Sequence, residues 1–226
     1  MVKIKGWKKS EIIFLVSVLL FIVIHSLIRH DSITATVNAV CGITYTFIAG
    51  KGNPICYLFG VTGSGFYSYL SFQNMLWGNL VLYLCYYIPM QILGFFQWNK
   101  NLKDGKKEII KRYLPQKELY ILICLTLFLI ILTAFALNYF KDTHPILDSI
   151  TAICSIGGMY LTVRRAIEQW LFWMIVNFLS LIMWSYVALN GARVYSTIIM
   201  WTVYLILAIY FYFSWRREIK YGKNNI

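Results

Sequence analysis

The side chains with the greatest chemical potential in this 226-residue chain are amides and aromatic rings set inside long apolar stretches. In one stretch, offsets of 4, 8, 11 and 15 residues define a single helical face, formed by Tyr83, Tyr87, Gln91, Gly94 and Trp98. In a second stretch, offsets of 3, 7 and 14 relate Trp170, Trp173, Asn177 and Trp184, and Asn38 opens a third. Aromatic walls with amide groups suit a neutral or delocalised cationic ring that bears hydroxyl groups.

Each of these residues also has a purely structural interpretation. Gln91 and Asn177 would serve equally well as hydrogen-bond partners between packed helices. Three tryptophans near the ends of stretches are typical of the aromatic belt at a membrane surface: Trp98, Trp170 and Trp215. Small residues that repeat every four positions indicate close helix packing or, alternatively, the lining of a path: Gly60, Ser64 and Ser68. Pro89 frees a backbone carbonyl one turn earlier and predicts a bend beside a cavity.

Some residue types are absent where chemistry would need them. Glu11, Asp148 and Glu168 fall at the ends of apolar stretches, and no charged residue lies near the middle of one. Ion coupling normally depends on such a group, and a phosphorylated substrate would need Arg or Lys partners, so we expect neither. The three histidines lie near stretch ends, and the five cysteines, without CxxC spacing, are expected to be buried free thiols. We therefore expect no metal, no cofactor and no catalytic site.

The amino-acid composition indicates that these residues lie in a lipid bilayer rather than in water. Apolar residues make up 59% of the chain and charged residues 13%, which excludes a soluble domain. A bilayer needs about 20 apolar residues per helix. On that criterion the sequence predicts an all-α membrane protein with eight spans, at residues 11–28, 33–49, 54–72, 75–98, 119–140, 145–163, 168–189 and 194–215.

The basic residues predict how these spans are oriented. If both termini are cytoplasmic, the external side holds only three of the 21 Lys and Arg residues, Arg29, Lys141 and Arg193, and the remaining 18 lie inside. The net charge of +12 is therefore a topology signal that requires no nucleic-acid partner. The polar segment 99–118 is expected to be a cytoplasmic amphipathic helix or basic loop. A cleaved signal peptide is the alternative for the first span.

The chain also contains a weak internal repeat. A shift of 113 residues aligns Cys41 with Cys154 and Lys51 with Arg164, and a shift of 117 aligns Tyr87 with Tyr204 and Trp98 with Trp215. Two three-helix units with one reversing span between them would have the same orientation. The expected organisation is a basic segment and extra helix (1–30), a first repeat (31–98), a basic segment and linker helix (99–144), and a second repeat with a basic tail (145–226).

Two motifs and the basic ends together resemble the PnuC family of bacterial nicotinamide riboside transporters. The motifs are the Glu-Gln-Trp element at residues 168–170, continuing to Asn177, and the Pro-x-Gln-x-x-Gly element at residues 89–94. The resemblance implies a parallel 3+1+3 fold like that of the SWEET sugar transporters, in the opposite orientation, in the bacterial inner membrane. It implies substrate contacts at Gln91, Trp173 and Asn177; helix-face geometry adds Asn38, Tyr87 and Trp184.

The resemblance also implies a mechanism. Family members import nicotinamide riboside, a vitamin B3 precursor of NAD, by facilitated diffusion, and a cytoplasmic kinase traps the product by phosphorylation. A homo-oligomer, such as a trimer, is expected. Relatives that carry thiamine or riboflavin leave another vitamin or nucleoside open as the substrate, and a non-transporting membrane scaffold is the alternative from a different class.

Overall fold

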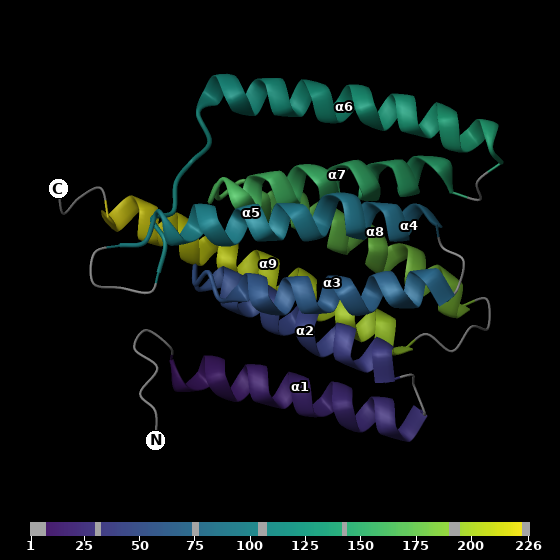
Figure 1. Ribbon diagram of the computed structural model, residues 1–226, viewed down its shortest axis with the longest axis horizontal. Helices are drawn as coiled ribbons and strands as arrows, with labels where there is room; N and C mark the ends of the chain where they lie inside the picture. Colours follow the sequence, from purple (N-terminus) through teal and green to yellow (C-terminus); the bar gives the residue numbers. More distant parts are fainter. Residues whose placement is uncertain are drawn as a thin grey trace.

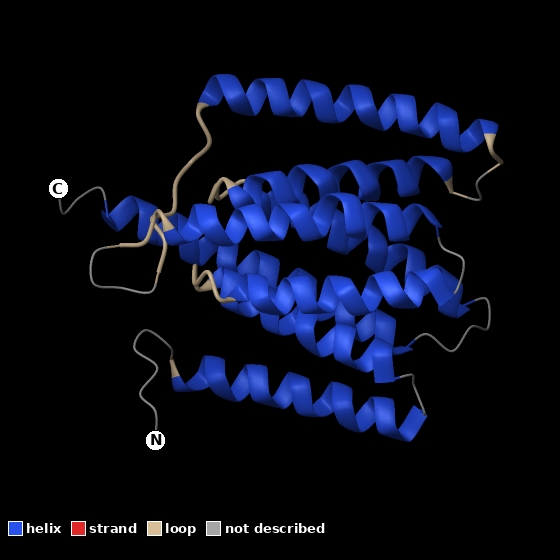
Figure 2. Ribbon diagram, viewed as in Figure 1, coloured by secondary structure: helices blue, strands red, loops and turns tan. Residues whose placement is uncertain are grey.

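The computed structural model describes residues 8–29, 33–73, 77–103, 108–141, 144–189 and 195–222, and within these ranges all regular structure is helical. The helices are α1 (Lys9–Arg29), α2 (Ile33–Gly50), α3 (Cys56–Gln73), α4 (Trp77–Leu82), α5 (Ile88–Asn99), α6 (Gln116–Tyr139), α7 (Pro145–Val163), α8 (Gln169–Leu189) and α9 (Tyr195–Gly222). Figure 2 shows a bundle of helices, with a long connection between α5 and α6 at one end. A π-helical turn, η1 (Tyr83–Tyr87), joins α4 to α5, so these three elements form one continuous rod.

Each predicted apolar stretch contains one helical rod, with ends that differ by a few residues. The predicted starts at Met75 and Val194 lie outside the described residues. Five rods contain segments long and apolar enough to cross a bilayer: Lys9–Ile28, Leu80–Asn99, Gln116–Tyr139, Pro145–Val163 and Ile198–Tyr221. Shorter apolar helices occur at Thr36–Gly50 and Gln169–Met183. The chain is therefore an all-α, multi-pass membrane protein.

The helices pack as two triplets with two additional helices outside them (Figure 1). The N-terminal triplet comprises α2, α3 and the α4–α5 rod, and the C-terminal triplet comprises α7, α8 and α9. The triplets meet where α2 packs on α9 and α5 packs on α7. On the outside, α6 packs along α7, and α1 packs along α2 with a smaller contact to α9.

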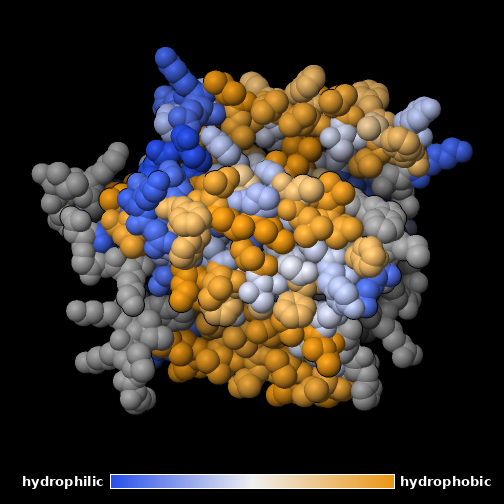
Figure 3. Space-filling model, viewed as in Figure 1, coloured by the Kyte–Doolittle hydropathy of each residue, from blue (hydrophilic) through white to orange (hydrophobic). Residues whose placement is uncertain are grey.

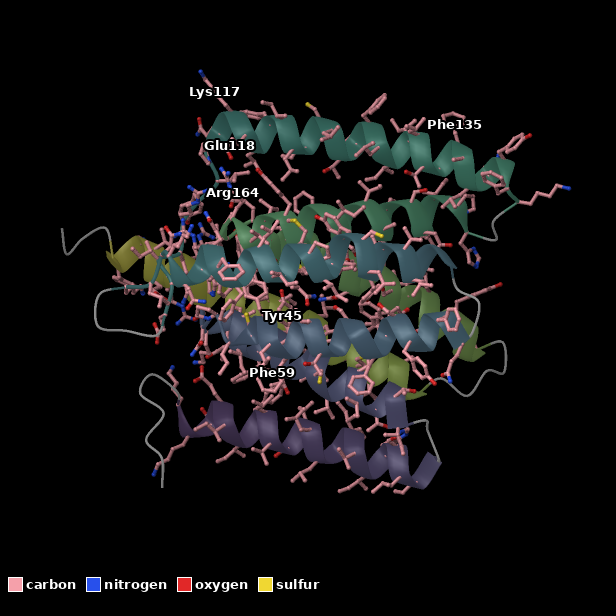
Figure 4. The ribbon with its side chains drawn as sticks, in the orientation of Figure 1. Tyr45, Phe59, Lys117, Glu118, Phe135 and Arg164 are labelled. Carbon is pink, nitrogen blue, oxygen red and sulfur yellow. The ribbon has the colours of Figure 1, made fainter. Side chains whose placement is uncertain are left out.

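The outer faces of α1 and α6 are strongly apolar. Leu27 of α1 is 70% exposed and Phe135 of α6 is 72% exposed, and Figure 4 shows Phe135 pointing away from the bundle. Figure 3 shows apolar side chains over the upper part of the view, where α6 lies, and over the lower part, where α1 lies. Such a surface is stable when lipid covers it. The expectation of buried thiols is therefore wrong for Cys85 and Cys124, which are exposed on this isolated chain, whereas the other three are buried.

Charged residues collect at one end of the bundle, which we call the basic end. It comprises turns 50–53 and 164–168, together with residues 100–103 and 108–115 of the polar segment, on the left in Figures 1 and 3. Of the two structures expected for this polar segment, its described residues form the loop. The loop joins both turns, because Ile109 N–H donates to the Gly52 carbonyl at 2.9 Å and Arg112 N–H donates to the Arg165 carbonyl at 3.2 Å.

Two ionic contacts fix peripheral elements at this end. Glu11 of α1 accepts hydrogen bonds from the Lys51 ammonium and from the Tyr210 hydroxyl of α9, the latter at 2.6 Å. Glu218 accepts from Lys103 and Lys111 of the loop. These partners hold α9 in place beyond its apolar part, so the helix continues to Gly222 rather than ending at Trp215 as predicted.

The membrane-belt interpretation of three tryptophans is wrong. Trp98, Trp170 and Trp215 are 0%, 2% and 0% exposed, and all three belong to one buried core. Their indoles therefore pack between helices and do not meet the surface of the membrane. In an apolar helix, the lipid-facing and protein-facing sides carry the same kinds of residue. The position of these tryptophans near the ends of spans therefore did not distinguish a membrane belt from a buried core.

Candidate substrate-binding cavity

A cavity of about 580 Å³ lies between the two triplets. Five of the six predicted site residues line it: Asn38, Tyr87, Gln91, Trp173 and Asn177. They come from α2, η1, α5 and α8, so the cavity draws on both triplets. Trp184 lies in α8, and its side chain is outside the part of the structure that is described. The cavity is within the size range of small-molecule sites.

Gln91 combines the two roles that the sequence left open. Its side chain is 4% exposed, and its Nε2 donates to Ser64 Oγ of α3 at 3.0 Å. Its Oε1 is buried with no hydrogen-bond partner among the described residues. Gly60 permits this approach, since a Cβ there would lie 2.9 Å from Oε1. One amide atom therefore joins two helices, and the other remains available as an acceptor beside the cavity.

Trp173 is held by α7. Its indole Nε1 donates to Thr162 Oγ1 at 3.2 Å, and the ring lies over Gly158, where a Cβ would be 3.1 Å away. Asn177 follows one helical turn later on α8 and is 5% exposed. A larger residue at position 158 would displace the ring, so α7 sets the wall of the cavity through a glycine and a hydroxyl.

The π-helical turn precedes Pro89. Proline has no N–H, and the N–H of Ile88 bonds five residues back to the Tyr83 carbonyl, which widens the helix. This turn presents a ladder of phenol rings: Tyr67 and Tyr83 have ring centroids 4.3 Å apart, and Tyr83 and Tyr87 have centroids 4.7 Å apart. All three rings line the cavity, so the distortion beside Pro89 does accompany a cavity, as predicted.

Residues outside the predicted set also reach the cavity. Tyr45 Oη, Trp170 Nε1 and Trp201 Nε1 are buried, lack a hydrogen-bond partner among the described residues, and belong to lining residues. Figure 4 labels Tyr45 within the bundle. An unpaired buried polar atom is costly, so these groups are available as hydrogen-bonding partners for a polar ligand. Helix spacing had already placed Trp170 on the face of Trp173 and Asn177, but it did not single out Tyr45 or Trp201, which belong to no repeated set of amide or aromatic positions.

The extra helix α1 contributes to the wall. Phe21, Ile22, His25 and Ser26 line the cavity, and Ser26 forms a hydrogen bond with Thr36 of α2. His25 is one of the three histidines expected near the ends of apolar stretches, and that expectation did not place it beside a cavity. His30 lies outside the described residues, and His144 precedes α7.

The cavity has few side chains that ionise near neutral pH, and His25 is the basic one among its described lining residues. Among its described lining residues there is no Asp, Glu, Lys or Arg. Polarity comes instead from amides, hydroxyls and indole N–H groups, and the walls are rings of tyrosine and tryptophan. Such walls bind a flat or cationic ring through their faces, while the amides fix its substituents.

Comparisons with known proteins agree with this architecture. The sequence model of the family described as nicotinamide mononucleotide transporter matches residues 32–217. A nicotinamide riboside transporter PnuC from Neisseria mucosa is 29% identical over 220 residues, which cover 95% of this chain and 84% of that protein. The PnuC of Haemophilus influenzae is 27% identical over 219 residues, with 96% and 94% covered.

The structural likeness is equally extensive. The crystal structure of a vitamin B3 transporter PnuC superposes with a TM-score of 0.81 at 28% identity, covering 95% of this chain and 94% of that one. The family is one of transporters rather than enzymes. With its all-helical bundle and the match over residues 32–217, this chain belongs to the PnuC family of membrane transporters.

Proposed function

We propose that this protein imports nicotinamide riboside by facilitated diffusion across the bacterial inner membrane. The observation that carries the proposal is a cavity of about 580 Å³ with aromatic walls, unpaired polar atoms and no Asp, Glu, Lys or Arg among its described lining residues. The relatives named nicotinamide riboside transporter support the same substrate.

The substrate's chemistry matches these groups. Nicotinamide riboside has a cationic pyridinium ring, a carboxamide and ribose hydroxyls. Tyr87 and Trp173 can hold the ring through cation–π attraction, worth about 1 to 2 kcal/mol without a carboxylate. Gln91, Asn177 and Asn38 offer donors and acceptors for the carboxamide and hydroxyls. In this proposal Trp184, on the same face of α8, is the sixth contact.

The phosphorylated mononucleotide is rejected in this proposal, although the family description carries its name. Its phosphate adds about two negative charges at neutral pH. Without Lys or Arg among the described lining residues, burial of those charges would be uncompensated. The riboside enters, a cytoplasmic kinase phosphorylates it, and the product cannot return, which makes accumulation of the vitamin for NAD synthesis one-way.

The arrangement in the membrane is part of the proposal. The α2–α5 and α7–α9 triplets correspond to parallel repeats within 31–98 and 145–226, with α6 as the reversing helix and α1 as the extra span. All eight rods then cross the membrane, and the basic end is cytoplasmic. Support comes from the packing of α6 along α7 and from the start of α1 and end of α9, which lie at the same end of the bundle. Assembly as a homo-oligomer, such as a trimer, stays a prediction.

Orientation is testable by cysteine labelling. A cysteine at Lys100, an exposed residue at the basic end, should resist a membrane-impermeant maleimide added to intact cells and react after the cells are opened. Cysteine at Lys141, expected outside, is the matched control and should react in intact cells. Labelling of position 100 from outside would contradict the topology.

Transport is tested in liposomes that contain only this protein. Radiolabelled nicotinamide riboside should reach equal concentrations inside and outside, with or without an imposed proton or sodium gradient. Thiamine and the mononucleotide, added in excess, should not compete. Accumulation above the external concentration that collapses with an ionophore would overturn facilitated diffusion, and full competition by thiamine would change the substrate.

A further inference from the structure

Between the cavity and the basic end, buried aromatic rings fill the interior. We call this layer the aromatic plug, which consists of Phe47, Tyr57, Trp98, Trp170, Phe211 and Trp215. Each ring is at most 2% exposed, and all belong to one core that includes Ile109 of the loop. Of the six, Trp170 also lines the cavity. A substrate that leaves the cavity at the basic end must therefore pass this layer.

Two tryptophans of the plug join the triplets to each other. Trp98 of α5 donates from Nε1 to the Thr162 carbonyl of α7 at 2.9 Å. Trp215 of α9 donates from Nε1 to the Gly50 carbonyl of α2 at 2.7 Å. Each bond thus runs from one triplet to the other. Both acceptors lie in the last turn of a helix, where carbonyls have fewer backbone N–H partners.

The two bonds occupy equivalent places in the repeat. The shift of 117 residues aligns Trp98 with Trp215, and the shift of 113 aligns Tyr57 with Trp170. Tyr57 packs edge-on to Trp98 with centroids 5.1 Å apart and planes at 79°, and Trp170 packs edge-on to Trp215 at 5.6 Å and 84°. An edge-on aromatic pair that contains an indole donor is therefore built twice across one interface, as Tyr57–Trp98 and as Trp170–Trp215.

The loop covers one of these tryptophans. Lys111 Nζ lies 5.2 Å from the centre of the Trp215 ring and also contacts Glu218. Burial lowers the pKa of Lys111, and the nearby Glu218 carboxylate opposes that shift. Ile109 packs in the same core and bonds through its N–H to Gly52. The loop thus adds contacts that keep the plug closed.

We infer that Trp98 and Trp215 form a paired latch: their two indole–carbonyl bonds close the basic end of the cavity and break when the substrate is released there. The latch rests on the proposed transport function. Each bond joins the triplets directly, so a separation of the triplets at this end must break both. Loss of one such bond shifts the closed–open equilibrium by about fivefold, which is small enough for routine opening.

Cys56 provides a reporter within the protein. It is 0% exposed, lies at the start of α3 and belongs to the same core as the plug. In a variant whose other cysteines are replaced by alanine (Cys41, Cys85, Cys124 and Cys154), the rate of maleimide labelling measures how often the plug opens. The assay uses purified full-length protein and needs no substrate, so it is independent of whether the riboside is the cargo.

The test compares three substitutions of tryptophan by phenylalanine, which keep an aromatic ring and remove the indole N–H. Trp98→Phe and Trp215→Phe should each raise the Cys56 labelling rate about fivefold. Trp170→Phe is the matched control: it lies in the same plug, and its Nε1 has no partner among the described residues. Its labelling rate should stay within twofold of the parent.

The outcomes separate the latch from general loosening of the core. Size-exclusion chromatography first establishes which variants are folded, and because the repeat supplies two positions, either one gives the result. Equal labelling of all three variants, or of the latch variants and the parent, would overturn the latch. Failure of the parent to take up riboside in liposomes would overturn the proposed function instead, without altering the labelling result.

Discussion

Tryptophans of the aromatic plug and of the cavity wall differ in how many of their indole N–H groups have a hydrogen-bond partner. In the aromatic plug, the indoles of Trp98 and Trp215 donate to backbone carbonyls. Around the cavity, the indole N–H groups of Trp170 and Trp201 are buried without a partner among the described residues. A satisfied indole stabilises helix packing, and an unsatisfied one beside a cavity is available to a ligand. For the indole N–H, availability to a ligand therefore depends on its partner. Trp173, whose N–H donates to Thr162 Oγ1, can meet a ligand only through the face of its ring.

The largest expected change in riboside affinity comes from a substitution in the cavity wall. Trp173→Ala removes the ring that α7 positions through Gly158 and Thr162, and riboside binding should weaken roughly 30-fold, as expected for loss of about 2 kcal/mol of cation–π attraction. Titration calorimetry on the purified protein measures it. Phe135→Ala on the outer face of α6, 72% exposed, is the control and should bind as the parent does. Unchanged binding by the Trp173 variant would place the site elsewhere.

A smaller effect separates the two roles of Gln91. Gln91→Leu removes the unpaired Oε1 together with the bond to Ser64, and binding should weaken roughly tenfold. Ser64→Ala removes only the interhelical bond and leaves Oε1 beside the cavity, so binding should weaken roughly threefold at most. The same calorimetric titration compares the two. If Ser64→Ala costs as much affinity as Gln91→Leu, the amide acts through packing alone.

The smallest effect is expected at the surface of the basic end. Lys103→Gln removes one of the two ion pairs of Glu218, and the side chains of Lys103 and Glu218 are 29% and 34% exposed. Exposed pairs contribute at most about 1 kcal/mol, so the melting temperature should fall by roughly 2 to 4 °C. Thermal denaturation at low and high salt measures it, and the difference between variant and parent should shrink in high salt. A difference that persists in salt would indicate a packing role for Lys103.

The helices were predictable because the bilayer imposes a length and a composition on each span. Eight apolar stretches therefore appear as eight helical rods, and Gln91, Asn177 and Trp173 reach one cavity because helical spacing fixes which side chains share a face. Their function as ligands stays a prediction. Whether a given helix face points to lipid or to the protein interior was not predictable, because the two surroundings are equally apolar.

The equal apolarity of lipid and protein interior also explains which predictions were wrong or incomplete. Trp98 and Trp215 lie near the ends of apolar spans, which is also where belt tryptophans lie, and only the contacts between triplets distinguish the two. The place of Tyr45 beside Gln91 depends on Gly60, where an added Cβ would lie 2.9 Å from both side chains. Such proximity comes from tertiary packing and leaves no periodic signal in the sequence.

The isolation of α6 makes it a natural attachment point for spectroscopic probes. Only 6% of its apolar segment is buried, it packs along α7, and no residue lining the cavity comes from it. It also carries Cys124, an exposed free thiol. A fluorophore on that thiol would sit on the outer flank of the C-terminal triplet. With a second dye on the N-terminal triplet, single-molecule energy transfer could follow the relative movement of the two triplets in a working transporter.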